Sequence, residues 1–528
     1  MGSIQPHRDG PSVSTSFTRA LVDEGVAVVV ASSGGQPASI ANERPSHARY
    51  WLVGLFALAA LLRLYGITAE CLWLDEGFTL QKVSLPFGEM LAATARDVHM
   101  PLHDIVLWPF FQLFGESEWV LRLPSLVFSL LTLALAGRIA LEMFGEQARL
   151  ITVAILALSP LHIIYAQEGR PYALFGFLAA WSMFRLVLFL RSPDRRNAIF
   201  WCAVTLLLMY SHYYAVFIVA AANAFVITQR LWSRVPTVSL RMWFAMQAVV
   251  ALCVLPWVPF VLDSVQGVQG AFWIPRPNLE MFVKLAAYYG GYAFPLVALL
   301  VLYAWVARRR VADLVSRQPL ALPPGAPLAL LSWWMLLPIA VPVLLSFVTQ
   351  PLFHQRFTIA SSTAVYILMG AAIAAIGGSL RRRQVQIVVV FVLLSLHIPA
   401  LVWLWRFERK PEWRDLVALL EQRGPSDQLV LAPDEERWAF MYHAREAELG
   451  LTPTRLRDVA PIAPHQVPPA TSTIWVARNR FDQRPGDERA IAERVLPGRR
   501  LAFEVLYPRL HIQRWELDGA PPPPGAPP

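Results

Sequence analysis

Two adjacent carboxylates, Asp75 and Glu76, begin a polar stretch about nine residues after the first long apolar segment ends. Their neighbours Trp73, Leu74 and Phe78 are apolar, which is unusual for acids that serve only solubility. Ionisable groups close to an apolar region are costly and tend to be functional. A carboxylate in such a place suits general base catalysis, whereas a solvated surface loop is the plainer interpretation.

A second polar group, Asp97 and His99, lies just before Pro101. Proline suits the first position of a helix because it has no backbone N–H to satisfy. We therefore expect Asp97 and His99 beside a helix N-terminus, which is a favourable place for an anion. A simple cap at the membrane interface explains the same residues.

Glu168 and Arg170 lie between two long apolar segments with almost no loop. Charges so close to hydrocarbon need partners, so the pair indicates either an internal ion pair or a binding site. His354 and Arg356 mark a later polar break of the same kind. A lone His212 at another break is more typical of a packed histidine at a helix end.

The composition indicates that these groups belong to a polytopic membrane protein. The 528 residues are 56% hydrophobic and 16% charged, with a mean hydropathy of +0.45, whereas a soluble domain carries about 25% charged residues. The net charge of +9 does not indicate nucleic-acid binding, because the basic residues form short clusters between apolar segments. The 3 cysteines form no disulfide or metal-binding spacing.

Eleven segments are apolar and long enough to cross a bilayer, which takes about 20 residues. They are approximately 50–66, 120–142, 150–166, 171–190, 198–212, 213–229, 243–262, 284–306, 327–348, 357–378 and 385–405. A shorter apolar stretch, 101–114, begins at Pro101.

The orientation follows from four basic clusters, which the positive-inside rule places in the cytoplasm. The clusters are Arg191/Arg195/Arg196, Arg230/Arg234/Arg241, Arg308–Arg310 and Arg381–Arg383. All four are cytoplasmic only if 101–114 lies along the interface instead of crossing it. This single assumption brings five segments to the outer side, together with everything after about residue 406. The five are 67–119, 166–171, 211–215, 263–283 and 349–356.

The fold class expected is an all-α polytopic membrane protein, with about 11 transmembrane helices, interfacial juxtamembrane helices and a small C-terminal α/β extramembrane domain. Its domains are a disordered cytoplasmic tail (1–48), the transmembrane domain (49–405), a periplasmic α/β domain (406–518) and a disordered Pro-rich tail (519–528). In the α/β domain, Pro411–Gly424 is expected to be an amphipathic helix. Three short runs are β-prone: Leu429–Ala432, Thr473–Val476 and Leu501–Tyr507.

Several spaced motifs resemble the glycosyltransferase C superfamily, specifically bacterial members of family 39, the protein mannosyltransferase-like group, to which lipid A aminoarabinose transferases are related. They are Asp75-Glu76, Asp97-x-His99-x-Pro101-Leu102, Phe114-Gly115-x-Ser117-Glu118-x-x-Leu121-Arg122-Leu123-Pro124-Ser125, Leu158-Ser159-Pro160-x-His162-x-x-Tyr165-x-Gln167-Glu168-x-Arg170-x-Tyr172, Ser211-His212-Tyr213, Arg356 and Trp413-Arg414. The resemblance covers about residues 50–430. Met100, His103 and Gly169 depart from the family's usual residues, which leaves the subgroup open.

The resemblance implies a sugar transfer from a polyprenyl-phosphate donor to a hydroxyl acceptor on the periplasmic face, usually with inversion. Asp75 is then the general base, and Glu76 supports it or positions the acceptor. Cationic groups must stabilise the departing phosphate, and Arg170 and Arg356 are the first candidates for this role.

The remaining candidates in the donor site are His99, His354, Asp97 and Glu168. The two histidines are weaker candidates for the phosphate, and Glu168 would orient Arg170 or contact the sugar. No cofactor is expected: a divalent metal is compatible with the superfamily, but no spacing here requires one.

A transporter or flippase of lipid-linked sugars is the alternative function, because eleven or twelve helices suit many transporters. Transporters often show paired repeats and broken helices at the midplane, whereas here no internal repeat is evident, the polar groups gather at one surface and a long acidic first loop precedes the interfacial segment. The expected location is the bacterial inner membrane, with the N-terminus in the cytoplasm. The expected partners are the lipid-linked donor, membrane lipids and an acceptor. The sugar and the acceptor, whether protein, lipid or envelope glycan, stay open.

Overall fold

The computed structural model describes residues 47–97, 99–232, 239–268, 274–318, 323–377, 379–407, 409–424, 427–455, 473–480, 489, 491 and 498–517. The two tails expected to be disordered, 1–48 and 519–528, lie outside these residues except for 47 and 48, which begin the first helix.

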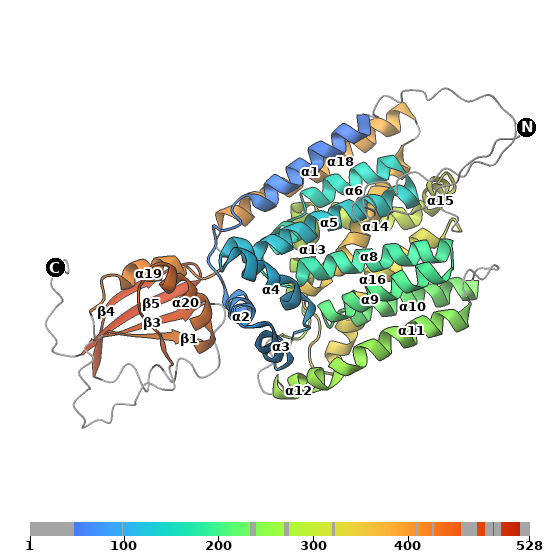
Figure 1. Ribbon diagram of the computed structural model, residues 1–528. Helices are drawn as coiled ribbons and strands as arrows, with labels where there is room; N and C mark the ends of the chain where they lie inside the picture. Colours follow the sequence, from blue (N-terminus) through green and yellow to red (C-terminus); the bar gives the residue numbers. More distant parts are fainter. Residues whose placement is uncertain are drawn as a thin grey trace, which may run out of the picture. The chain divides into compact units, whose positions relative to one another are not determined.

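Among the described residues, 8 helical segments are long and apolar enough to cross a membrane, or 9 if the bent pair α6 and α7 forms one span. The eight are α1 (His47–Leu64), α5 (Glu118–Phe144), α8 (Tyr172–Arg191), α11–α12 (Leu240–Asp263), α13–α14 (Leu279–Val306), α16 (Ala326–Val348), η3–α17 (Gln355–Ile376) and α18 (Leu380–Arg406). The bundle is shown in Figure 1.

The sequence predicted eleven spans, and three of the predicted segments are not among these eight. The segment 150–166 is broken into α6 (Glu146–Ala157) and α7 (Pro160–Ala166), which meet at 58°. Ser159 caps α7 and Pro160 takes its first position, which explains the break. The segments 198–212 and 213–229 are the helices α9 (Arg195–Ser211, 17 residues) and α10 (Ala215–Trp232, 18 residues), and neither is counted among the candidate spans.

Helix α17 forms the centre of the bundle. In the most apolar 18 residues of its span, 94% are buried. The corresponding share is 11% in α1 and 22% in α18. A helix that is apolar all round is expected inside a bundle, and its small residues allow close contact. A Cβ atom at Gly370 would lie 2.2 Å from Thr152 Oγ1, so α17 packs closely against α6. This contact holds α17, which follows directly after the turn that carries Arg356, against α6.

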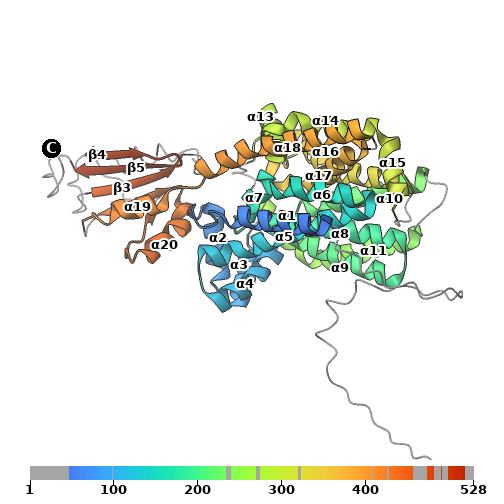
Figure 2. The same cartoon turned by 90° about the horizontal axis from the view of Figure 1, so that it is seen from above.

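Three short helices connect α1 to α5: α2 (Leu74–Val83), α3 (Phe87–Ala95) and α4 (Leu102–Phe114). They lie at the end of the bundle near the C-terminal domain (Figure 2). The 13 residues of α4 extend about 20 Å, which is less than the hydrocarbon thickness of about 30 Å. This length fits the expectation that 101–114 does not span.

The C-terminal domain contains a five-stranded mixed sheet in the order β2-β1-β3-β5-β4. Its strands are β1 (Gln428–Ala432), β2 (Thr454–Arg455), β3 (Thr473–Asn479), β4 (Arg499–Leu506) and β5 (Leu510–Leu517), with the helices α19 (Trp413–Leu420) and α20 (Arg437–Glu446). The three expected β-runs coincide with β1, β3 and β4. The expected amphipathic helix is α19, which buries Trp413, Leu416, Val417 and Leu420. Helix α20 and the strands β2 and β5 were not predicted from the sequence.

Candidate active site

The first turn of α2 carries both adjacent carboxylates, where the positive end of the helix dipole favours acids. Successive residues of an α-helix point about 100° apart, so the two side chains enter different surroundings. The Asp75 side chain is 25% exposed, whereas that of Glu76 is 0% exposed.

Glu76 is the centre of a buried ion network. Arg122 of α5 donates to both of its carboxylate oxygens at 2.9 Å, and Lys410 donates to Oε2 at 2.8 Å. The backbone N–H of Gly169 donates to Oε1 at 2.8 Å. Burial alone would raise the pKa of Glu76, but Arg122 and Lys410 outweigh it and hold the pKa well below its ordinary value. Glu76 has no exposed surface, so its contacts hold the first turn of α2 in place and leave no oxygen open to solvent.

Asp75 faces two guanidinium groups from distant parts of the chain. Its Oδ2 lies 3.5 Å from Arg356 Nη1, which is 281 residues away, and 3.7 Å from Arg170 Nη2. Arg170 also donates to the Asp75 carbonyl at 2.9 Å and to Thr79 Oγ1 at 2.7 Å. The Arg356 guanidinium donates to the Tyr172 hydroxyl at 3.2 Å. The sequence-based prediction that these charges converge on one face therefore agrees with the structure.

His99 and Asp97 extend this cluster away from Asp75. His99 Nε2 lies 2.6 Å from Arg170 Nη2, and its Nδ1 lies 3.0 Å from Asp97 Oδ2. Asp97 in turn accepts from Lys82 at 2.8 Å, and Lys82 also pairs with Asp104 at 2.8 Å. Burial would raise the pKa of Asp97, but His99 and Lys82 lower it below its ordinary value. This chain of contacts holds Arg170 in place.

His354 and Glu168 occupy two different positions beside the site. His354 caps the turn η3 (Gln355–Thr358), and its Nδ1 accepts from Arg356 Nε at 3.2 Å, so it orients that guanidinium. Glu168 is buried, and its Oε2 has no hydrogen-bond partner among the described residues. Burial raises the pKa of Glu168 above its ordinary value. The hydrogen bonds of Arg170 go to Asp75, Thr79 and His99, so the expected orienting contact from Glu168 is not formed.

The C-terminal domain packs directly on the helix that carries Asp75. A Cβ atom at Gly77 would lie 2.6 Å from the backbone nitrogen of Ala439 in α20. The N–H of Leu72 donates to His443 Nε2 at 3.1 Å, and Arg414 pairs with Glu118 at 2.6 Å. These contacts, together with the Lys410–Glu76 pair, make the domain part of the support for α2.

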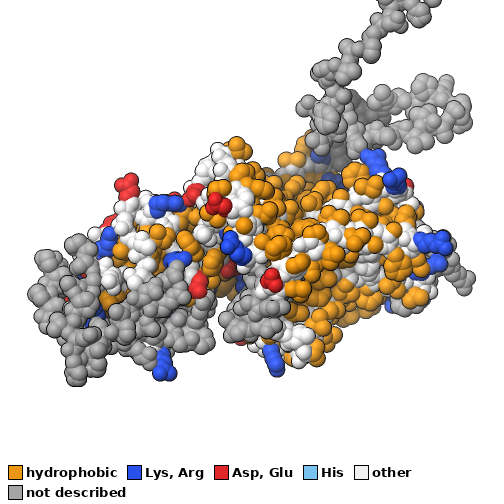
Figure 3. Space-filling view, turned by 60° about the horizontal axis from the view of Figure 1, so that its bottom comes forward, with side chains coloured by type: hydrophobic (Ala, Val, Ile, Leu, Met, Phe, Trp, Pro, Cys, Tyr) orange, Lys and Arg blue, Asp and Glu red, His pale blue; other side chains and the backbone are white. Residues whose placement is uncertain are grey.

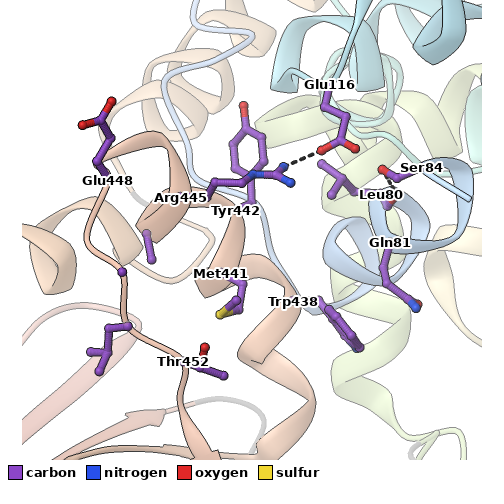
Figure 4. Close-up of a pocket in the computed structure, with 13 residues that line it drawn as sticks. Leu80, Gln81, Ser84, Glu116, Trp438, Met441, Tyr442, Arg445, Glu448 and Thr452 are labelled. Atoms are coloured by element: carbon purple, nitrogen blue, oxygen red, sulfur yellow. Dashed lines mark hydrogen bonds and ion pairs between the residues drawn. The ribbon is translucent and has the colours of Figure 1, made fainter.

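A cavity of 610 Å³ lies between α2 and α20 (Figure 4). Leu80 and Gln81 of α2 and Ser84, the residue after it, line the cavity, and so do Arg445 and Glu116, which form an ion pair. Asp75 is not among its lining residues, so the cavity is separate from the charged cluster.

Several residues that build the site were given no role in the sequence analysis, namely Thr79, Lys82, Arg122, Tyr172 and Lys410, of which Arg122 and Tyr172 were noted only as positions of the family motifs. Arg122 carried a signal, because it is a charge within the expected span 120–142. Lys410 carried none, since its partner lies 334 residues earlier.

Across the described residues, no group of three or more His, Cys, Asp or Glu is arranged to hold a metal ion.

Comparisons with known proteins agree with this architecture. A family model described as dolichyl-phosphate-mannose-protein mannosyltransferase matches residues 98–260. No curated relative matches the sequence. The fold is similar to that of ArnT from Cupriavidus metallidurans, in the apo state (TM-score 0.57, 15% identity, 89% of this chain and 98% of that chain) and bound to undecaprenyl phosphate (TM-score 0.55, 14% identity, 88% and 98%).

An oligosaccharyltransferase of Archaeoglobus fulgidus, in complex with zinc and sulfate, has a TM-score of 0.50 at 13% identity over 75% of this chain and 61% of that chain. The family model confirms the predicted resemblance to the protein mannosyltransferase-like group over residues 98–260, and the solved structures show a similar fold. They also confirm the fold class, a helical membrane protein with a small C-terminal sheet domain.

Proposed function

We propose that this chain is an inverting membrane glycosyltransferase that moves a hexosyl or pentosyl group from a polyprenyl-phosphate donor to a hydroxyl acceptor. The observation that carries the proposal is the setting of Asp75. It is a partly exposed carboxylate between Arg356 at 3.5 Å and Arg170 at 3.7 Å. A base and two cations are the groups that such a transfer needs.

In the proposed reaction, the acceptor hydroxyl attacks the anomeric carbon while its proton passes to the Asp75 carboxylate. The bond between that carbon and the phosphate oxygen breaks, and its electron pair leaves with the lipid phosphate. Arg356 and Arg170 stabilise the charge that develops on this oxygen. A phosphate that accepts hydrogen bonds from the side of the Arg356 guanidinium away from Asp75 would lie roughly 6–7 Å from the Asp75 carboxylate. This separation leaves room for in-line attack on a sugar between the phosphate and Asp75.

The other candidate residues take supporting roles in this proposal. His99 and Asp97 fix Arg170, and His354 fixes Arg356. Glu168 would contact the sugar, because it is buried and its Oε2 has no hydrogen-bond partner among the described residues. The proposal invokes no metal ion.

We place the reaction on the periplasmic face of a bacterial inner membrane. The support is the distribution of charge along the spanning helices. Arg381–Arg383 begin α18, whereas Lys410, which pairs with Glu76, follows its other end. Under the positive-inside rule, this arrangement puts the basic end in the cytoplasm and Asp75 outside. The acceptor class is a protein, a lipid or an envelope glycan.

The test is mass spectrometry of envelope glycans and lipids from a deletion strain that expresses single variants. Asp75→Asn should reduce product by about 10²–10⁴-fold, which is the typical contribution of a general base. Glu89→Gln is the matched control, because Glu89 is an exposed acid on α3 and has no role in the proposed reaction. Full product with Asp75→Asn would refute the assignment of the base. Translocation of the lipid-linked sugar by the wild-type protein in proteoliposomes, without glycosylated product, would favour a transporter.

A further inference from the structure

A second cavity, of 950 Å³, lies at the far end of the bundle from Asp75. Its walls come from α15 (Arg308–Ser316) with the residue after it, from the start of α6 and from the start of α18. Helix α18 has 27 residues and ends near Lys410, so the cavity lies roughly 40 Å from the Glu76 network. It is therefore independent of the candidate active site.

Four arginines line this cavity from two walls. Arg310 and Arg317 come from α15 and its end, and Arg382 and Arg383 come from the first turn of α18. Arg310 donates to the Tyr303 hydroxyl at 3.3 Å. Within the described part of the chain, none of the four guanidinium groups forms an ion pair with a carboxylate. Such a concentration of guanidinium groups, none of them in an ion pair with a described carboxylate, attracts an anion.

The acidic residues of the lining leave an excess of positive charge. Asp313 and Glu146 also line the cavity, so four positive and two negative groups give +2. Glu146 already pairs with Arg149 at 3.2 Å. A ligand that carries two negative charges therefore complements the cavity.

The surroundings of the cavity indicate that this ligand is a lipid. Helix α15 buries Val311 and Val315 and exposes its arginines, which is typical of a helix that lies in the membrane interface. Leu380 and Ile387 of α18 are 78% and 67% exposed, so a lipid-facing surface borders the cavity. Figure 3 shows basic side chains at the end of the hydrophobic surface that lies away from the C-terminal domain.

We infer that this cavity binds the headgroup of an anionic phospholipid with two phosphates, of the diphosphatidylglycerol class. Each wall supplies two guanidinium groups, and one phosphate can bond to each wall through paired N–H donors. Basic pockets between helices at the cytoplasmic surface are suited to such headgroups. The cavity volume lies within the usual range for a ligand site.

The test is native mass spectrometry of the full-length protein with diphosphatidylglycerol and phosphatidylglycerol in competition at equal total charge. The wild-type protein should prefer diphosphatidylglycerol by at least about fivefold, which is the effect of one additional basic contact. Arg382→Gln with Arg383→Gln should abolish this preference, and Arg310→Gln with Arg317→Gln should do the same from the other wall.

The matched control is Arg308→Gln with Arg309→Gln. It removes the same charge from the same basic helix, but neither residue lines the cavity. This control should weaken the binding of both lipids by the same factor, so the ratio of their affinities should stay that of the wild-type protein. The proposal is overturned if the wild-type protein shows no preference, or if the control pair abolishes the preference as the cavity pairs do. Displacement of the lipid by millimolar pyrophosphate would also overturn it, since the ligand would then be a soluble phosphate.

Discussion

The two adjacent carboxylates of α2 point to different sides of the helix, and their surroundings differ in exposure and in the length of their contacts. On one side, Asp75 is partly exposed and its carboxylate is 3.5 and 3.7 Å from two guanidinium groups. On the other side, Glu76 is fully buried and accepts hydrogen bonds of 2.8–2.9 Å from Arg122, Lys410 and Gly169. The accessible side has the longer and looser contacts, which a substrate can replace, and the buried side has the shorter ones, which hold the helix. This difference supports the proposed roles, in which Asp75 is the base and Glu76 positions it.

The largest expected effect is that of Glu76→Gln on stability. Removing this charge leaves Arg122 and Lys410 buried without compensation, and breaking a buried ion pair typically costs about 3–5 kcal/mol. Chemical denaturation of the protein in detergent micelles measures the change in unfolding free energy. Asp75→Asn is the comparison on the accessible side and should change it by less than about 1 kcal/mol.

A double variant sharpens the same result. Glu76→Gln with Lys410→Met removes both a charge and one of its partners, so its loss should be smaller than the sum of the two single losses. Additive losses would mean that Lys410 does not stabilise Glu76, and the positioning role of the C-terminal domain would fail.

The second effect concerns the contact between α2 and α20. Gly77→Ala places a Cβ atom 2.6 Å from the backbone of Ala439, and overpacking of this kind costs about 1–3 kcal/mol. Gly88→Ala is the control: Gly88 also lies in a helix, but a Cβ atom there meets nothing within 4 Å. We expect Gly88→Ala to stabilise by up to about 1 kcal/mol. Equal denaturation midpoints for the two variants would argue against close packing of the C-terminal domain on α2.

The sequence was sufficient to predict the accessible side but not the buried one. The basic clusters define an orientation, and that orientation alone places Asp75, Arg170 and Arg356 on one face. Which of two adjacent acids is buried depends on partners such as Lys410, which no local pattern connects to Glu76. For the same reason α20 was not recognised: it packs on α2, and most of the chain lies between these two helices in the sequence. The local β-signals of β1 and β3 were sufficient because both strands are short and almost wholly buried.

The third effect is a difference in acid sensitivity. The pKa of Glu76 is lowered in the folded protein, so its stabilising contribution is present above pH 4.5 and is lost as the pH falls through the folded value. When the pH falls from 6 to 3.5, protonation linked to Glu76 should lower the unfolding free energy of the wild-type protein by about 1.4 kcal/mol. Denaturation at both pH values should show a shallower loss for Glu76→Gln. An identical loss for both proteins would assign the acid sensitivity to other carboxylates, such as Asp97 and Asp104.

The smallest effect is expected at the cavity between α2 and α20, where Arg445 pairs with Glu116 across the two parts of the chain. The Arg445 side chain is 62% exposed, and exposed ion pairs typically contribute about 0.2–1 kcal/mol. Arg445→Ala should therefore change the unfolding free energy by less than about 1 kcal/mol, and about 0.5 M salt should reduce even this difference. If Arg445→Ala instead matched the loss from Glu76→Gln, the two parts would be joined mainly by their exposed contact, and the buried Lys410–Glu76 pair would not be what positions Asp75.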